Sequence, residues 1–94
     1  MTLQTTTERS SLEDVLCSKT TVKILKTLRK YGRLNTSEIA GRVNSSFALV
    51  ASHLRMLENQ DILTHADFGV RSHIYRFSES PRAKALIKLL EAWE

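Results

Sequence analysis

Residues 45–60, SSFALVASHLRMLENQ, are the stretch around which the rest of the chain is arranged. Its apolar residues recur at helical spacing and predict one dry face: Phe47, Val50, Leu54 and Leu57. Ser45 is the expected N-cap, because its hydroxyl can accept a hydrogen bond from an unpaired N–H of the first turn. The opposite face carries mostly small or hydrogen-bonding residues: Ser45, Ala48, Ser52, Arg55 and Asn59. Because only Arg55 is both long and charged, this face is slim enough to enter a duplex groove and meet base edges.

A second helix is predicted just before this one, over Asn35–Asn44. Asn35 and Glu38 have the spacing of a capping box. Gly41 costs about 1 kcal/mol of helix propensity, which is tolerable where another helix crosses closely. With a tight turn at 43–45, the two helices make a helix-turn-helix unit. Its first helix crosses the nucleic-acid backbone in that arrangement, and three residues are therefore candidate phosphate contacts: Thr36, Ser37 and Arg42.

The hydrophobic period changes from helical to alternating after Gln60. Ile62–Phe68 and Val70–Phe77 are rich in β-branched and aromatic residues and are separated by Gly69, which predicts a β-hairpin, or wing. Leu34 is expected to add one rung to this small sheet. Arg71, at or beside the tip, can reach a phosphate or a minor groove, although a charged tip is also typical of any exposed hairpin.

Three further helices are predicted outside the central unit: Ser11–Cys17, Thr20–Tyr31 and Pro81–Glu94. The last helix is more apolar than the core of a small domain requires, which favours a partner subunit over a purely internal role. The expected dimer interface takes residues from the first and last helices: Leu12, Leu16, Cys17, Leu86, Leu89, Leu90 and Trp93. Cys17 is the single cysteine, so it forms no internal disulfide; we expect it to be a buried small hydrophobe, with an inter-chain bridge as the alternative.

Length and charge fit one small domain with a polyanionic partner. We expect the 94 residues to form a disordered tail, 1–10, and one domain, 11–94. The formal net charge of the chain is +4. Between Lys19 and Arg55 the only acid is Glu38, among eight basic residues: Lys19, Lys23, Lys26, Arg29, Lys30, Arg33, Arg42 and Arg55. No apolar run approaches the about 20 residues that span a bilayer, and no signal peptide is evident, so we expect a cytoplasmic, nucleoid-associated protein without a membrane partner.

The predicted fold is mainly α with a small β-hairpin wing, in the order helix, helix, (strand), helix, helix, strand, strand, helix. This order, the segment VASHLRMLENQDIL and a hairpin ending in IYRF resemble the ArsR-type winged helix-turn-helix regulators. Five residues match the family pattern: Val50, Ser52, His53, Leu54 and Leu57. Ala51 stands where that family often has Ser, and Asp61 where it often has Gly. The resemblance implies a homodimer joined by its first and last helices, and transcriptional control; MarR-type and archaeal winged-helix proteins share much of the layout.

The metal sensing of that family does not carry over to this chain. The segment Ser37–Val43, where the family's thiolate pair would lie, has no cysteine, and Arg82–Glu94 has no histidine. His53, His65 and His73 show no ligand spacing along the sequence, and His53 is expected to pack and to form a hydrogen bond. We therefore expect no cofactor and no metal effector.

These patterns predict a homodimeric, sequence-specific reader of double-stranded DNA that regulates transcription, as a repressor. The expected base contacts come from the central helix and its cap: Ser45, Ser46, Ala48, Ser52 and Arg55. One alternative is an architectural protein that coats DNA without reading it, and another is a protein-interaction winged helix. An enzyme is not expected, because the sequence offers no nucleophile–base pair, glycine-rich phosphate loop or carboxylate cluster.

Overall fold

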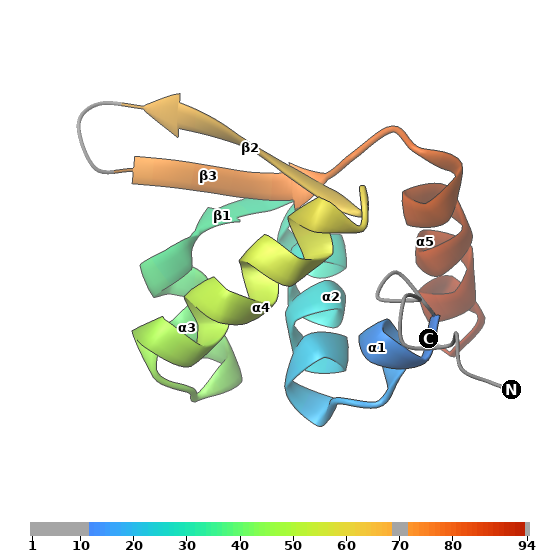
Figure 1. Ribbon diagram of the computed structural model, residues 1–94, viewed down its shortest axis with the longest axis horizontal. Helices are drawn as coiled ribbons and strands as arrows, with labels where there is room; N and C mark the ends of the chain where they lie inside the picture. The colour runs from blue at the N-terminus through green and yellow to red at the C-terminus, as the bar shows by residue number, and fades with distance from the viewer. Residues whose placement is uncertain (1–11, 69–71, 94) are drawn as a thin grey trace, which may run out of the picture.

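The computed structural model describes residues 12–68 and 72–93. These residues form five helices and three strands: α1 (Leu12–Leu16), α2 (Lys19–Tyr31), β1 (Arg33–Asn35), α3 (Thr36–Val43), α4 (Phe47–Asn59), β2 (Leu63–Phe68), β3 (Ser72–Phe77) and α5 (Pro81–Trp93). The order confirms the predicted winged helix-turn-helix architecture (Figure 1). None of the described helices has the length and apolar character needed to cross a membrane. The expected tail, 1–10, and Ser11, the expected start of the first helix, lie outside the described residues.

α2 is the central helix, with α3 and α4 on one side and α1 and α5 on the other (Figure 1). The large aliphatic side chains that are fully buried come mainly from α2, α3, α4 and the start of the hairpin: Ile24, Leu25, Leu28, Ile39, Val50, Leu54, Leu57, Ile62 and Leu63. Each such burial stabilises the fold by about 1.5–3 kcal/mol before the entropy of ordering is counted. The helix-turn-helix unit is therefore held on α2 by a continuous aliphatic core.

The helix ends are fixed by side-chain caps. The predicted capping box is confirmed: Asn35 Oδ1 accepts from Glu38 N at 2.8 Å, and Glu38 Oε1 accepts from Asn35 N at 2.9 Å. The predicted cap of α4 is wrong by one residue, since Ser46 Oγ accepts from Leu49 N at 3.1 Å. Asn44 ends α3 in the left-handed conformation, with φ 56°. The turn between α3 and α4 is therefore one residue longer than expected, and Ser46 instead of Ser45 lies at the start of α4.

Three other expectations about burial are wrong. Phe47 is 57% exposed, because the elements packed against α4 cover its apolar stripe only from Val50 onward. Cys17 is exposed, since α1 ends at Leu16 and the cysteine lies in the turn that follows. A Cβ added at Gly41 would meet no atom within 4 Å, so close helix crossing does not explain this glycine.

The three strands form one antiparallel sheet in the order β1-β3-β2. Leu34 is the expected rung and pairs with Tyr75, which in turn pairs with His65 on the other side. Leu63 and Tyr75 are buried against the helices, and Figure 1 shows the two strands of the hairpin running above α3 and α4. Arg71, at the predicted tip, lies outside the described residues.

A tight junction joins α4, the hairpin and α5. Asp61 has φ 63°, a left-handed conformation that short polar side chains tolerate best after glycine. Its carbonyl oxygen accepts from Ser78 Oγ at 2.8 Å and from Ser80 Oγ at 2.5 Å. Ser80 also caps α5, because its Oγ accepts from Ala83 N at 3.1 Å. This junction explains why Asp61 can occupy a position where the ArsR-type regulators often have Gly.

Truncation of the buried stripe of α4 should unfold the protein more easily than truncation elsewhere on that helix. We expect Leu54→Ala to lower the free energy of unfolding by about 2–5 kcal/mol, because it leaves a cavity in the core. Leu49→Ala is the matched control: Leu49 is 45% exposed on the same helix, and we expect about 1 kcal/mol or less. Urea unfolding followed by circular dichroism measures both, and equal losses would contradict the assigned stripe.

Candidate nucleic-acid interface

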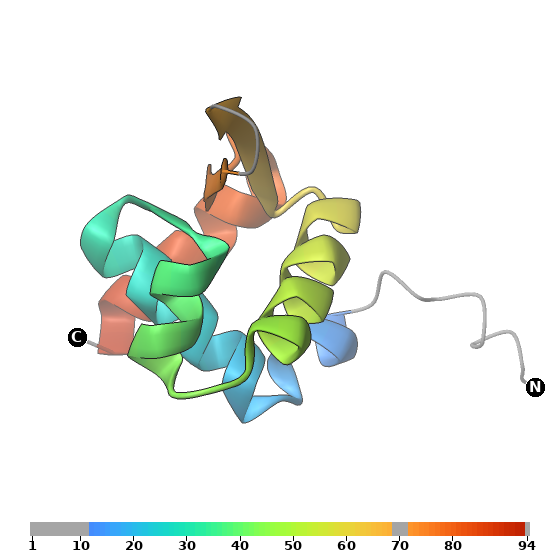
Figure 2. The same cartoon turned by 90° about the vertical axis from the view of Figure 1, so that its left-hand side faces the viewer.

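The outward face of α4 has the composition expected of it from the sequence. Four residues spaced along one side of the helix are all exposed: Ala48, Ser52, Arg55 and Asn59. On the opposite side of α4, the buried apolar stripe of Val50, Leu54 and Leu57 packs on α2 and α3. Figure 2 shows α3 and α4 lying next to each other toward the viewer, with the hairpin above them. No described element covers this face of α4.

A polar contact in addition to the apolar stripe holds α4 on α2. Thr21 is fully buried, and its Oγ1 lies 3.0 Å from Nδ1 of His53. His53 therefore packs and forms a hydrogen bond, as predicted. Because a buried hydroxyl without a partner costs about 1–3 kcal/mol, this pair favours one rotation of α4 about its axis. Ala48, Ser52, Arg55 and Asn59 are thereby directed outward.

The serines before α4 lie where the helix begins. Ser46 is exposed, and while its Oγ accepts the capping bond, its O–H can still donate to a ligand. Ser45 is half-buried. Phe47, which was predicted on the buried face, and Leu49 are both exposed beside them. The first turn of α4 therefore combines hydroxyl donors with apolar surface.

The structure separates the residues of α3 expected at phosphates. Ser37 and Arg42 are exposed, whereas Thr36 is only 8% exposed. The side chain of Thr36 is directed into the fold, because the first turn of α3 packs beside β1. The contact expected from that side chain is not supported, while Ser37 and Arg42 remain accessible.

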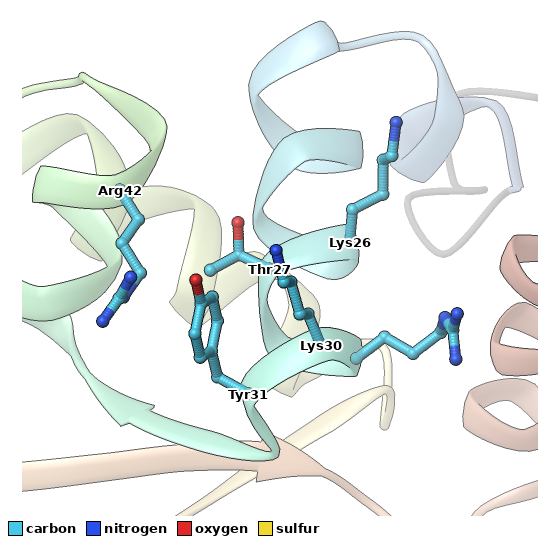
Figure 3. A pocket seen from close by; sticks show the side chains of 6 residues that line it. Lys26, Thr27, Lys30, Tyr31 and Arg42 are labelled. Atoms are coloured by element: carbon cyan, nitrogen blue, oxygen red, sulfur yellow. The ribbon is translucent and has the colours of Figure 1, made fainter. Parts of the chain in front are cut away.

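A basic groove runs between α2 and α3. Its larger cavity, about 760 Å³, is shown in Figure 3 and is lined by Lys26, Thr27, Arg29, Lys30, Tyr31 and Arg42. The Arg42 guanidinium lies 4.0 Å from the centroid of the Tyr31 ring, and Lys30 Nζ lies 5.5 Å from the same centroid. A smaller cavity of about 320 Å³ shares Lys26 and Arg42 and continues to Asn44 in the turn before α4.

The groove brings together residues that are far apart in the sequence. Tyr31 is exposed and serves as a platform for Arg42. The fold also gathers two cations of α2, Lys26 and Lys30, beside Arg42. Arg29 instead turns toward α5, with Nη1 4.0 Å from Glu91 Oε2. Only the packing of α2 on α3 reveals this gathering, since no linear spacing connects residue 30 to residue 42.

The inner face of the hairpin holds a polar cluster next to α4. Donor atoms of His65, Asp67 and His73 lie within 4.8 Å of one another, although these residues show no ligand spacing along the sequence. Strand pairing, which is invisible in sequence spacing, brings them together. Burial raises the pKa of the neighbouring Tyr75 phenol; the Glu58 and Asp67 carboxylates raise it further, and Arg55 acts in the opposite direction.

An apolar surface spans α1 and α5. Trp93 is 80% exposed and Leu89 is 40% exposed, and Leu12 and Leu16 of α1 are exposed as well. Two apolar hollows of about 380 and 490 Å³ lie on this side and share Leu16, Leu86 and Leu89 among their lining residues. Leu86 is itself buried, so it supports the surface from beneath.

Solved structures of other proteins share this fold. HlyU from Vibrio cholerae is similar with a TM-score of 0.75 and 21% identity, over 97% of this chain and 97% of that chain. The AntR antimony-specific transcriptional repressor is similar with a TM-score of 0.71 and 25% identity, over 85% of this chain and 70% of that chain. The transcriptional repressor PagR of Bacillus anthracis is similar with a TM-score of 0.67 and 24% identity, over 94% and 99%. No curated protein sequence matches the chain.

A family model provides the match that assigns the chain. The model is described as winged helix-turn-helix DNA-binding and matches residues 18–64, half of the chain. The matched segment begins at the cap of α2, contains α3 and α4, and reaches into β2. It therefore includes the helix-turn-helix unit and the outward face of α4, and the predicted winged helix-turn-helix architecture is confirmed. The chain belongs to the winged helix-turn-helix DNA-binding family.

Proposed function

We propose that this protein is a sequence-specific regulator of transcription that binds double-stranded DNA as a homodimer and represses by occupying a promoter. The observation that carries this proposal is the exposed, nearly uncharged face of α4, because a non-specific binder needs charge there instead of hydrogen-bonding groups. Two proteins of the same fold, AntR and PagR, are transcriptional repressors. The protein would act in the cytoplasm, on the nucleoid.

Direct readout would come from α4 and its cap in the major groove. Arg55 can make a bidentate contact to guanine O6 and N7, which discriminates bases by about 1–3 kcal/mol. Ala48 is small enough to lie against a thymine methyl, and Ser52 can donate to or accept from a base edge. Ser45 and Ser46 are close enough to the helix start to reach a base or its phosphate.

Phosphate contacts would come from α3 and the basic groove. Arg42 is the central residue, because its stacking on Tyr31 restricts its rotamers and lowers the entropy lost on binding. Ser37 lies in the first turn of α3, where backbone N–H groups and the helix dipole also favour an anion. Lys26 and Lys30 extend the positive surface along α2. Arg71 stays a candidate contact of the wing.

Dimerisation would use the apolar surface of α1 and α5. Leu12, Leu16, Leu89 and Trp93 supply exposed area, Leu86 and Leu90 support it, and Cys17 lies at its edge. A solvated Trp with a neighbouring apolar hollow is typical of an interface anchor. Two copies would present their α4 helices about 34 Å apart, one turn of DNA.

Two arginine variants separate sequence readout from phosphate binding. Selection of bound DNA from a random pool first supplies the preferred site, which we expect to be palindromic. On that site and on scrambled DNA, Arg55→Ala should weaken specific binding about 5- to 150-fold while sparing non-specific binding. Arg42→Ala should weaken both and reduce the slope of log K against log salt by about 1.

The same titrations test the competing interpretation. A specificity ratio near one for the unaltered protein, with a steep salt slope, would identify an architectural binder. Equal losses from Arg55→Ala on both DNA molecules would contradict its proposed role at a base. Arg42→Lys is the control for charge: it should restore much of the salt slope, because one cation is kept.

Oligomeric state tests the apolar surface separately. Leu89→Glu should shift the protein from dimer to monomer in sedimentation equilibrium, because it buries an unpaired charge in the interface. Leu49→Glu is the matched control, since Leu49 is 45% exposed and Leu89 40%, and it should leave the dimer intact. A monomeric unaltered protein, or equal effects of both variants, would overturn the proposed interface.

A further inference from the structure

A group of metal-type ligands lies on the inner face of the hairpin, outside the surfaces assigned to DNA and to dimerisation. His65 and Asp67 belong to β2, and His73 belongs to β3. One ligand atom from each lies within 4.8 Å of the other two. Among the described residues, these three form the one cluster of His, Cys, Asp or Glu side chains that could hold a metal ion.

The strand register builds this group. Asp67 is paired directly with His73 across the hairpin, and His65 comes two residues earlier on β2. Because side chains alternate along a strand, all three point to the same face of the sheet. That face continues into Tyr75 and Leu63, which are buried against the helices. The cluster is therefore supported by the core at one end and open to solvent at the other.

The carboxylate of Asp67 lies between the two imidazoles. Its Oδ1 is 2.5 Å from His73 Nδ1 and 3.5 Å from His65 Nε2. The two rings are nearly perpendicular, with centroids 5.1 Å apart. Ligands of a tetrahedral zinc ion, at bond lengths of about 2.0 Å, are separated by about 3.3 Å, which falls between these two distances. Small side-chain rotations would bring all three to bonding distance.

Glu58 on α4 provides the outer contact that such a site requires. Its Oε2 lies 2.7 Å from Nδ1 of His65. When His65 donates its Nδ1–H to this carboxylate, the lone pair of Nε2 faces Asp67. A carboxylate that orients a ligating histidine in this way is the usual second partner of a zinc-bound imidazole.

We propose that His65, Asp67 and His73 bind one divalent transition-metal ion, with zinc the best fit, and that water fills a fourth position. Two imidazoles and a carboxylate are ligands that zinc accepts, and three protein ligands with an open position give a four-coordinate site. The bound ion would join β2 to β3 directly and both strands to α4 through Glu58. This proposal is independent of the proposed function, because it concerns the hairpin in the absence of DNA.

Metal titration of the full chain, first freed of metal by a chelator, tests the site. We expect one Zn²⁺ per chain by calorimetry, and Co²⁺ should give the visible absorption of a tetrahedral site. Zn²⁺ should also raise the Tm by mass action. His73→Ala and Asp67→Asn should each weaken binding at least about 100-fold, and Glu58→Gln about 10- to 100-fold, because the last removes only the orienting carboxylate.

Two variants control for other ligands. His53→Gln removes the histidine that contacts Thr21 and leaves the cluster intact, and Cys17→Ser removes the exposed thiol. Both should bind Zn²⁺ as the unaltered protein does. Asp67→Asn preserves shape at an exposed position, so a loss of binding with an unchanged circular dichroism spectrum reports on ligation and not on folding.

Three outcomes would overturn the site. The first is the absence of saturable Zn²⁺ and Co²⁺ binding by the folded chain, which would leave the cluster as a hydrogen-bonded link between strands. The second is binding that His73→Ala and Asp67→Asn leave unchanged. The third is binding that Cys17→Ser abolishes, which would place the metal at the thiol. DNA titrations do not enter these measurements, so the two proposals fail separately.

Discussion

The structure depends on the burial of one side of α4. Val50, Leu54 and Leu57 are completely excluded from solvent and attach the helix to α2 and α3. Because these residues occupy a single stripe, the helix has only one way to dock, and its small polar residues must face outward. The aliphatic stripe thus determines which side chains of α4 are presented to solvent.

Polar contacts fix the orientation of α4 more narrowly than hydrophobic burial alone would. The contact between Thr21 and His53 favours one rotation of α4, and Asp61 anchors the far end of the helix to the serines that precede α5. Glu58 then connects the same helix to the hairpin through His65. The hairpin therefore contacts α4 through a hydrogen bond as well as through packing, and Figure 2 shows it above α4.

The cations are distributed differently from what their positions along the chain suggest. Between residues 19 and 55 they form a basic stretch, but in the fold Arg29 turns to Glu91 on α5, whereas Lys26 and Lys30 lie beside Arg42. Tyr31 gives that groove a flat wall, and cation–π contact with the guanidinium limits its motion. The positive surface of this groove is therefore narrower and better ordered than the net charge implies.

The sequence by itself determined the elements and their order. Helical periodicity, the capping box at Asn35 and the alternation after Ile62 are local signals, because each depends on residues within a few positions of one another. The same signals predicted the outward face of α4: four of its five expected residues are exposed, and Ser45 is half-buried. Only the tertiary structure decided which residues from distant segments meet. The exposure of Phe47 and Cys17, the groove of Arg42 with Tyr31, and the cluster of His65 with His73 all depend on strand register or helix packing, which no spacing along one chain reveals.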